Sequence, residues 1–260
     1  MSQTTLNLKT APGYEILAAV GKTVLRPGGR AATAQLREWA NFQPDRTVLE
    51  LASGLGNSAI DLAKRYHVRV VGIEQDVDRV AIANANASTA GLADRVRFVR
   101  GNIFELEAIA ELFDYVLAEA ILTMQSPAGK AKILTGVCDR LKIGGKFLSH
   151  ELLARDNLET LRQDLIQTTR VNATPLSAID WNETFDRAGL AVTQQQTGAM
   201  RLLDPVQVLQ DEGVARTAQI IWNIVSEPAI RDRIVRMRQV FTQHHQDLGY
   251  IISCTVRGSA

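Results

Sequence analysis

Short apolar segments alternate with longer helical patterns along the first 155 residues of the chain. Residues 70–73 and 115–118 are nearly continuous in apolar side chains, which is typical of strands covered on both faces. The pattern predicts five strands in this part of the chain, at residues 47–52, 69–74, 96–100, 113–118 and 146–152. Because helical segments lie between successive strands, the sequence predicts an α/β fold with a parallel sheet and helices on both faces.

The pattern changes in the C-terminal part of the chain. It predicts a helix at residues 180–188 and two further strands at residues 190–198 and 249–256. Residues 204–246 form a long helical insertion before the last strand. Within it, apolar residues recur at helical spacing, at Ile230, Ile234, Met237 and Phe241. We expect this stripe to pack inward and the insertion to form a helical cap.

Composition is compatible with one compact domain. The chain has 260 residues, 46% of them hydrophobic, and no linker rich in Pro, Gly or Ser divides it. We therefore predict a single domain, residues 1–260. Its parts are an N-terminal helical segment (1–44), a cofactor-binding core (45–155) and a substrate-side half (156–260) with the cap at 204–246.

Charge and targeting signals favour small-molecule chemistry. The formal net charge of +1 gives no general reason to expect binding to nucleic acid or to a membrane. No apolar leader and no apolar run of membrane-spanning length is present, so a cytoplasmic location is predicted. Only two cysteines occur, without metal-ligand spacing, and no metal site is expected. The expected partner is a small molecule, with the protein as a monomer or homodimer.

Two glycines, Gly54 and Gly56, lie between the first predicted strand and the helix that follows it. Such a strand-to-helix turn lets the backbone approach a ligand closely. Eighteen residues after Gly56, the second predicted strand ends in Glu74, whose carboxylate is suited to accept hydrogen bonds from a ribose diol. The spacing therefore predicts a site for a nucleotide cofactor.

The spacing alone leaves two classes of cofactor open. Residues 54–59 also fit the G-x-G-x-x-A fingerprint of dinucleotide-binding proteins, so an NAD(P)-binding oxidoreductase is one alternative. A dinucleotide turn normally follows its strand at once. Here Glu50 lies within the strand, and Ala52 and Ser53 lengthen its exit before the glycines.

The pattern Glu50-x-x-x-Gly54-x-Gly56 resembles motif I of the class I S-adenosylmethionine-dependent methyltransferases. The resemblance implies that Glu50 helps to hold the methionine end of the cofactor. It assigns further cofactor contacts to the turn, at Ala52, Ser53, Gly54, Gly56 and Asn57.

Two later segments resemble further motifs of the family. Glu74 and Gln75 resemble motif II, which implies that Glu74 accepts from both ribose hydroxyls and that Gln75 packs on the adenine. Asn102 and Ile103 follow the third strand, where the family usually has Asp accepting from the adenine amino group. The amide oxygen of Asn102 can accept the same bond without the charge.

The resemblance extends to the next two strands. Ala118 and Glu119 end the fourth strand, which faces both cofactor and substrate in the family. Residues 141–147 resemble the turn before the fifth strand, with Ile143 in the place of the usual proline. The resemblance covers residues 45–155 well and the flanks loosely. It implies a Rossmann-like sheet of seven mostly parallel strands with an antiparallel last strand, and it leaves the acceptor open.

Gly28 and Gly29 precede a predicted helix near the N-terminus. Backbone N–H groups at a helix start suit a carboxylate or phosphate, so we expect these glycines to contact the cofactor carboxylate or the substrate. An ordinary loop between two helices is an equal alternative.

Methyl transfer from a sulfonium depends mainly on aligning the acceptor, and a general base matters only for a protonated nucleophile. The candidate catalytic residues are Glu119 at the fourth strand's exit and His150 near the end of the fifth. For His150, a hydrogen-bonded core histidine is the alternative.

The sequence thus predicts S-adenosylmethionine-dependent methyl transfer to a small-molecule acceptor, with S-adenosylhomocysteine as the product. The alternatives are the oxidoreductase and a cofactor-binding protein without catalysis.

Overall fold

The computed structural model describes residue 7, residues 10–156 and residues 158–258, so part of the expected N-terminal segment lies outside the described residues. Seven strands form one sheet in the order β3-β2-β1-β4-β5-β7-β6. Their bounds are β1 Thr47–Leu51, β2 Arg69–Glu74, β3 Val96–Arg100, β4 Phe113–Glu119, β5 Leu141–Ala154, β6 Leu190–Ala199 and β7 Leu248–Arg257.

The predicted sheet is confirmed. Strands β1 to β5 pair in parallel, whereas β7 is antiparallel to both of its neighbours, β5 and β6. Every predicted strand is present. The largest difference is in β5, which begins five residues before the predicted start at Lys146. Its early start arises because Leu141 pairs with Phe113 ahead of an irregularity in the register of β4 and β5.

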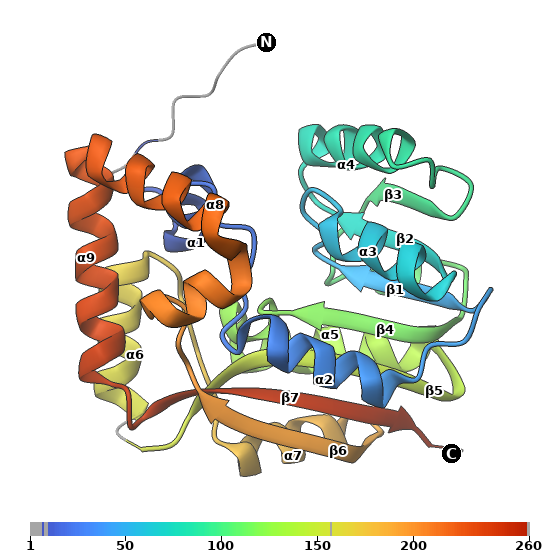
Figure 1. Ribbon diagram of the computed structural model, residues 1–260. Coiled ribbons are helices and arrows are strands. Elements are labelled where there is room, and N and C mark those ends of the chain that lie inside the picture. Colours follow the sequence, from blue (N-terminus) through green and yellow to red (C-terminus); the bar gives the residue numbers. More distant parts are fainter. Residues whose placement is uncertain (1–6, 8–9, 157, 259–260) are drawn as a thin grey trace.

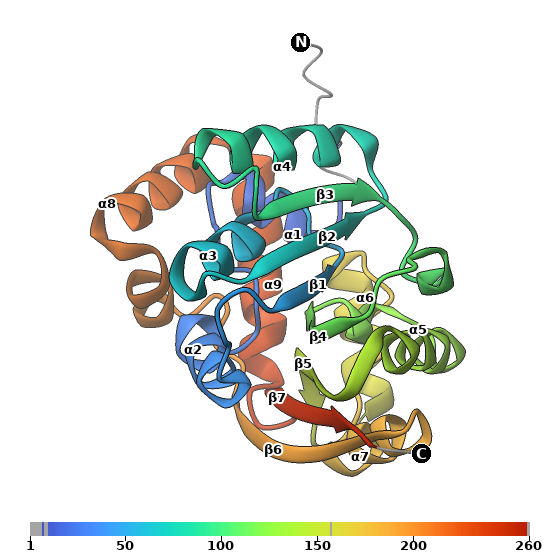
Figure 2. The ribbon, with the colours of Figure 1, turned by 90° about the vertical axis from the view of Figure 1, so that its right-hand side faces the viewer.

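Helices cover both faces of this sheet (Figure 1). Their bounds are α1 Gly13–Ala19, α2 Gly29–Ala40, α3 Asn57–Tyr66, α4 Val77–Thr89, α5 Pro127–Arg140, α6 Leu158–Thr169, α7 Ala178–Arg187, α8 Pro205–Ser226 and α9 Pro228–Gln243, with 3-10 turns η1 Leu106–Ala108 and η2 Leu122–Met124. Figure 2 shows α2, α3 and α4 on one face of the sheet, and α5 and α7 on the other. Each face therefore has its own apolar core.

Four helices, α1, α6, α8 and α9, gather at the end of the sheet toward which β1 and β4 point (Figure 1). The expected helical insertion consists of α8 and α9. Ile234 and Met237 are buried in a core with α1, and Ile230 and Phe241 pack against it, so the predicted inward stripe is confirmed. Gly213 interrupts α8 with φ 76° and ψ 167°, which bends the helix at that point. Among the described residues, no helix combines the length and apolar composition needed to cross a membrane.

Candidate active site

The turn after β1 is shaped by its two glycines. Gly54 has φ +55°, and a Cβ atom built there would meet nothing within 4 Å, so this side of the turn is open. Gly56 has φ +83°, and a Cβ atom there would lie 2.4 Å from the Phe98 ring. Gly54 therefore permits close approach of a ligand, while Gly56 permits close packing of the turn on the core.

Two alanines at the carboxyl edge have left-handed backbone conformations. Ala52 follows β1 with φ 51°, and Ala120 follows the neighbouring β4 with φ 57°. Such conformations cost non-glycine residues about 1–3 kcal/mol, and they tend to cluster at functional sites. Four other non-glycine residues of the described chain share this conformation, so the pair supports a site at the edge between β1 and β4 only together with the polar residues gathered there.

Glu74 is nearly buried at the end of β2 and binds the turn after β1. One carboxylate oxygen accepts the N–H of Gly54 at 2.9 Å, and the other accepts those of Gln75 at 2.9 Å and Asp76 at 3.1 Å. A carboxylate offers about four acceptor positions, so about one remains for a ligand hydroxyl. The expected bond to both ribose hydroxyls requires one backbone donor to give way.

Glu50, Glu119 and His150 lie on one face of three adjacent strands. Leu117 pairs with Glu50, so Glu119, two residues further along β4, points to the same face as Glu50. His150 pairs with Glu119. The structure thus brings together three of the predicted site residues.

Arg26 supplies the positive charge in this cluster. Its Nη1 contacts Glu119 Oε2 at 2.5 Å and donates to Ser58 Oγ at 3.0 Å, and Ser58 Oγ donates to Glu119 Oε2 at 2.7 Å. Burial alone would raise the pKa of Glu119, but Arg26 holds it below the ordinary value. Burial, together with the Glu119 charge, raises the pKa of Glu50 to about 8.

Three polar atoms of the cluster are buried without a hydrogen-bond partner among the described residues: Arg26 Nε, Glu50 Oε2 and Glu119 Oε1. Buried polar groups of this kind normally find partners. With Glu50 ionised, one open donor and two open acceptors match a ligand with a carboxylate and an ammonium group, such as the methionine end of S-adenosylmethionine. The residues present therefore fit the expected cofactor.

His150 holds the turn that contains Gly28 and Gly29. Its Nε2 accepts the Gly28 N–H at 3.0 Å, and its Nδ1 lies 3.4 Å from Thr33 Oγ1, which donates to the Gly29 carbonyl at 3.2 Å. Burial lowers the pKa of His150 to about 3, so the ring is neutral at physiological pH. This arrangement corresponds to the hydrogen-bonded core histidine of the sequence analysis.

Other predicted contact residues occupy the same edge of the sheet. Asn57 begins α3, and exposed Gln75 follows β2. Asn102 Oδ1 accepts the Phe104 N–H at 3.0 Å, so this amide already holds the turn after β3. Ile103 packs against the core on the α5 side, and Ala118 is buried in β4. The placement is compatible with the predicted contacts.

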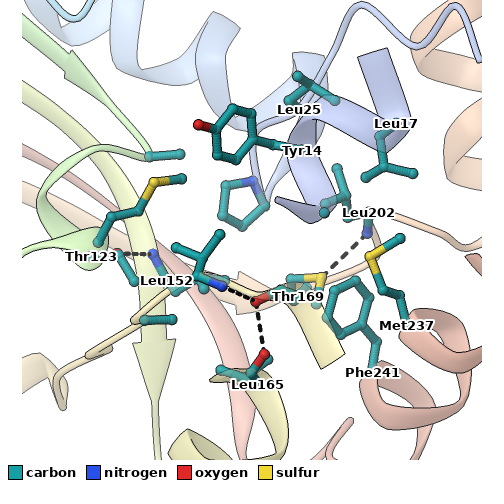
Figure 3. A pocket seen from close by; sticks show the side chains of 17 residues that line it. Tyr14, Leu17, Leu25, Thr123, Leu152, Leu165, Thr169, Leu202, Met237 and Phe241 are labelled. Atoms are coloured by element: carbon teal, nitrogen blue, oxygen red, sulfur yellow. Dashed lines mark hydrogen bonds between the residues drawn. The ribbon is translucent and has the colours of Figure 1, made fainter. Parts of the chain in front are cut away.

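An apolar cavity of about 100 Å³ adjoins the cluster. It is lined by residues of α1, α6 and α9 and of the segment after β4. Figure 3 shows Tyr14 and Leu25 on one side of it, and Thr123 and Leu152 on another. Two further lining residues, Pro27 and Ala120, directly follow Arg26 and Glu119 in the chain. The cavity therefore lies next to the polar cluster.

No charged side chain lines this cavity among the residues that the structure describes. Of its hydroxyl-bearing residues, Thr123 donates to Glu151 Oε2 at 2.6 Å and Thr169 donates to the Leu165 carbonyl at 2.7 Å. The Tyr14 hydroxyl makes no hydrogen bond within the described part of the chain, and burial raises its pKa. Tyr14 thus offers the cavity one neutral polar group.

A buried acid and a buried base fix the cavity wall at η2. Glu151 accepts the N–H groups of Leu122 at 3.0 Å and Thr123 at 2.8 Å, and burial raises its pKa to about 7. Lys130 Nζ donates to the carbonyls of Gln125 at 2.7 Å and Thr174 at 2.9 Å, and burial lowers its pKa to about 8. Within the described residues, no cluster of side chains could hold a metal ion.

Sequence reasoning did not assign Arg26, Ser58 or Tyr14. Arg26 lies two positions before Gly28, and Ser58 lies two positions after Gly56. Attention to the residues near these glycines could therefore have found both. Tyr14 lies in the seven-residue helix α1, which carries no motif. No sequence signal could have placed it.

Taken together, the sheet order and the turn after β1 define an α/β protein with a site for a nucleotide cofactor at the carboxyl edge. Residues 42–203 match the family described as a methyltransferase domain. The chain belongs to this family, which confirms the resemblance to class I methyltransferases and favours that interpretation over the oxidoreductase.

Individual proteins are similar to this chain over different lengths. An uncharacterised protein of Haemophilus influenzae is 33% identical over 248 residues, covering 95% of this chain and 98% of that protein. A 23S rRNA (uracil(1939)-C(5))-methyltransferase of Photobacterium angustum is 33% identical over 50% of this chain and 58% of its own. A methyltransferase structure from Geobacter sulfurreducens, solved with S-adenosylhomocysteine, has a TM-score of 0.68 at 18% identity, covering 94% of this chain and 98% of that one. The last similarity concerns the fold.

Proposed function

We propose that this methyltransferase uses S-adenosylmethionine to methylate a small, uncharged and largely apolar acceptor. The observation that carries the proposal is the apolar cavity beside the polar cluster, with no charged side chain among its described lining residues. Binding sites for small molecules are mostly apolar with a few placed polar groups. A cavity of order 150 Å³ holds benzene, so 100 Å³ suits an acceptor group smaller than benzene.

The cofactor supplies an electrophilic methyl group, and the residues of the chain bind and orient. In this proposal Glu74 accepts from the ribose, and the open atoms of Arg26, Glu50 and Glu119 receive the methionine carboxylate and ammonium groups. The N–H groups of Gly28 and Gly29 already donate to His150 Nε2 at 3.0 Å and to the Arg26 carbonyl at 3.1 Å, so these glycines hold Arg26 in place and offer the cofactor no free donor. The support is the fit of one donor and two acceptors to an amino-acid head group.

Glu119 is better suited to anchor the cofactor than to act as a base. A general base works best when its pKa lies near the operating pH, and Arg26 holds the pKa of Glu119 low. Neither Glu119 nor His150 lines the cavity. We therefore propose orienting roles for both and an acceptor, such as a neutral amine, that needs no side-chain base.

Relatives that act on RNA mark the main alternative class of acceptor. Another relative is a protein-lysine methyltransferase, and a lysine ammonium entering this cavity would lose its hydration without a partner of opposite charge. A base turned out of an RNA strand carries no charge, so methyl-transfer assays decide between RNA and a small molecule. The cavity therefore favours a small neutral acceptor. A cytoplasmic location and a monomeric or homodimeric state remain predictions from sequence.

Calorimetry and methyl-transfer assays test the proposal. The protein should bind S-adenosylhomocysteine and should bind NAD⁺ far more weakly. With labelled S-adenosylmethionine, it should methylate members of a panel of small aromatic amines, which are neutral at pH 7, and not an rRNA fragment or a lysine peptide. Preference for NAD⁺ would overturn the cofactor. Transfer to RNA or peptide alone would overturn the acceptor class, and binding without any transfer would favour a cofactor-binding protein that lacks catalysis.

A further inference from the structure

Two acidic residues of α8, Asp211 and Glu212, bind the N-terminal segment that carries Arg26 and Gly28. They lie directly before the bend at Gly213, at the end of the first half of the helix. The segment they bind, residues 22–30, comprises most of the connection between α1 and α2 and the first two residues of α2, and it contributes Leu25 and Pro27 to the cavity wall. Helix α8 belongs to the C-terminal insertion, so two distant parts of the chain meet here.

Glu212 binds the first part of the segment. Its Oε1 accepts the N–H groups of Thr23 at 2.8 Å and Val24 at 2.9 Å, and its Oε2 accepts the Thr23 hydroxyl at 2.7 Å. Lys22 Nζ lies 3.6 Å from Oε1, and the Glu212 side chain has 0% of its surface exposed. A shielded carboxylate with three donors and a cation forms strong charge-assisted hydrogen bonds.

Asp211 binds the last part of the segment. Its Oδ1 accepts the Arg30 N–H at 2.8 Å, and its backbone carbonyl accepts from Arg30 Nε. Its carboxylate packs over Gly29, where an added Cβ atom would lie 2.6 Å from Oδ2. Gly29 also has φ +65°, so the close approach and the backbone conformation both depend on glycine.

The two carboxylates therefore fix both ends of the residues that reach the polar cluster. Between Val24 and Arg30, Arg26 contacts Glu119 and Ser58, and Gly28 donates to His150. None of these three contacts involves α8 directly. A shift of the segment by about one ångström would nevertheless move the Arg26 guanidinium by a similar distance. Such a shift would weaken binding, because supporting residues must hold binding groups accurately in place.

We propose that Asp211 and Glu212 are positioning residues of the cofactor site and hold Arg26 and Gly28 in their binding positions. The inference rests on the proposed placement of the methionine end beside Arg26. Helix α8 thus supports the cofactor site although it does not contact the polar cluster directly. Cofactor bound at Arg26 in turn stabilises the contacts of residues 22–30 with α8.

Substitution of Glu212 tests the inference without using activity. Glu212→Gln retains the shape of the side chain but removes its charge and one of its two acceptor oxygens. By calorimetry, S-adenosylhomocysteine should bind at least tenfold more weakly to this variant. Amide hydrogen exchange at residues 23–26 of the ligand-free protein should become faster, and saturating product should restore part of the protection.

A control separates positioning from general weakening of α8. Asp204→Ala removes the N-cap, whose Oδ1 accepts from Val206 and Gln207, and weakens the helix without touching segment 22–30. This control should keep its affinity for product within about twofold. If Glu212→Gln does not fold, Thr23→Val removes only the hydroxyl donor and should weaken binding at least threefold.

The outcomes distinguish the two proposals. If wild-type protein does not bind S-adenosylhomocysteine, the proposed function fails. If wild type binds it and Glu212→Gln, or Thr23→Val in its place, binds equally well, the positioning role is refuted. Equal loss of affinity in Asp204→Ala and Glu212→Gln would also refute it, because helix stability alone would then explain the loss.

Discussion

The backbone N–H of Gly28 donates to Nε2 of His150 at 3.0 Å, across 122 positions of the chain. An imidazole nitrogen can accept only when it carries no proton, so this contact requires a neutral ring. Burial secures that state by lowering the pKa of His150 to about 3. Protonation of His150 would therefore release the segment that carries Arg26 from β5.

His150→Gln should retain much of the fold, because the amide oxygen can accept from Gly28. Unfolded His150 takes up a proton below pH 6.5, whereas the folded residue remains neutral to about pH 3. The stability of the wild type should thus decline, relative to His150→Gln, as the pH falls from 6.5 toward 3. Urea unfolding of both proteins across this range measures the difference. A constant difference would contradict the buried, neutral assignment.

Glu50→Gln should stabilise the ligand-free protein at alkaline pH and weaken cofactor binding. Burial raises the folded pKa of Glu50 to about 8, so the folded protein holds a proton that the unfolded chain releases above pH 4.5. Wild-type stability should therefore fall, relative to the variant, as the pH rises from 4.5 to 8. Urea unfolding measures this change, and calorimetry should show at least tenfold weaker binding of S-adenosylhomocysteine. A variant with unchanged affinity would exclude Glu50 from the cofactor site.

Glu74→Gln should weaken binding of S-adenosylhomocysteine by about 1.5–3 kcal/mol, the scale for hydrogen bonds to charged groups. The amide retains one acceptor oxygen for Gly54 or Gln75, so the turn is disturbed less than by alanine. Glu111→Gln is a suitable control, since its exposed carboxylate pairs only with Arg97 among the described residues. Equal affinities of both variants, measured by calorimetry, would exclude the ribose contact.

Glu151→Gln should lower the free energy of unfolding by about 1–3 kcal/mol at pH 8, because three donors then compete for one oxygen. Glu183→Gln removes an exposed carboxylate paired with Arg187 and should change stability by less than about 0.5 kcal/mol. Denaturant titration compares them. The affinity for S-adenosylhomocysteine should stay near that of the wild type, since Glu151 binds η2 beside the cavity proposed for the acceptor. A stable Glu151→Gln protein would show that η2 is held by other contacts.

The strands and the cofactor turn were predictable because their signals are local. Near-continuous apolar runs and the spacing of Gly54, Gly56 and Glu74 lie within short stretches of sequence, and the structure places these residues at one edge. The start of β5 was predicted too late, since Leu141 joins the sheet through a distant partner, Phe113. Pairing of that kind leaves no trace in the local pattern.

The polar contacts of the site could not be predicted in the same way. Glu212 and Thr23 are 189 positions apart, and nothing in the sequence near either residue identifies the other. Glu119 was singled out as a candidate base from its place at a strand end. Its lowered pKa depends on Arg26, which lies 93 positions away in the chain. Electrostatic roles depend on such tertiary neighbours.

Strand β7 lies between β5 and β6, although it is the last of the described strands to be synthesised. Val256 of β7 pairs with Lys146 of β5, and β7 is the only strand that pairs with β6 in the described sheet. During synthesis, β1 to β5 can pair while β7 is still absent, which leaves the outer edge of β5 uncovered. Open strand edges promote aggregation, and pairings between distant residues form slowly. Insertion of β7 is therefore expected to be a slow step of folding, and the edge of β5 stays open to aggregation until it is complete.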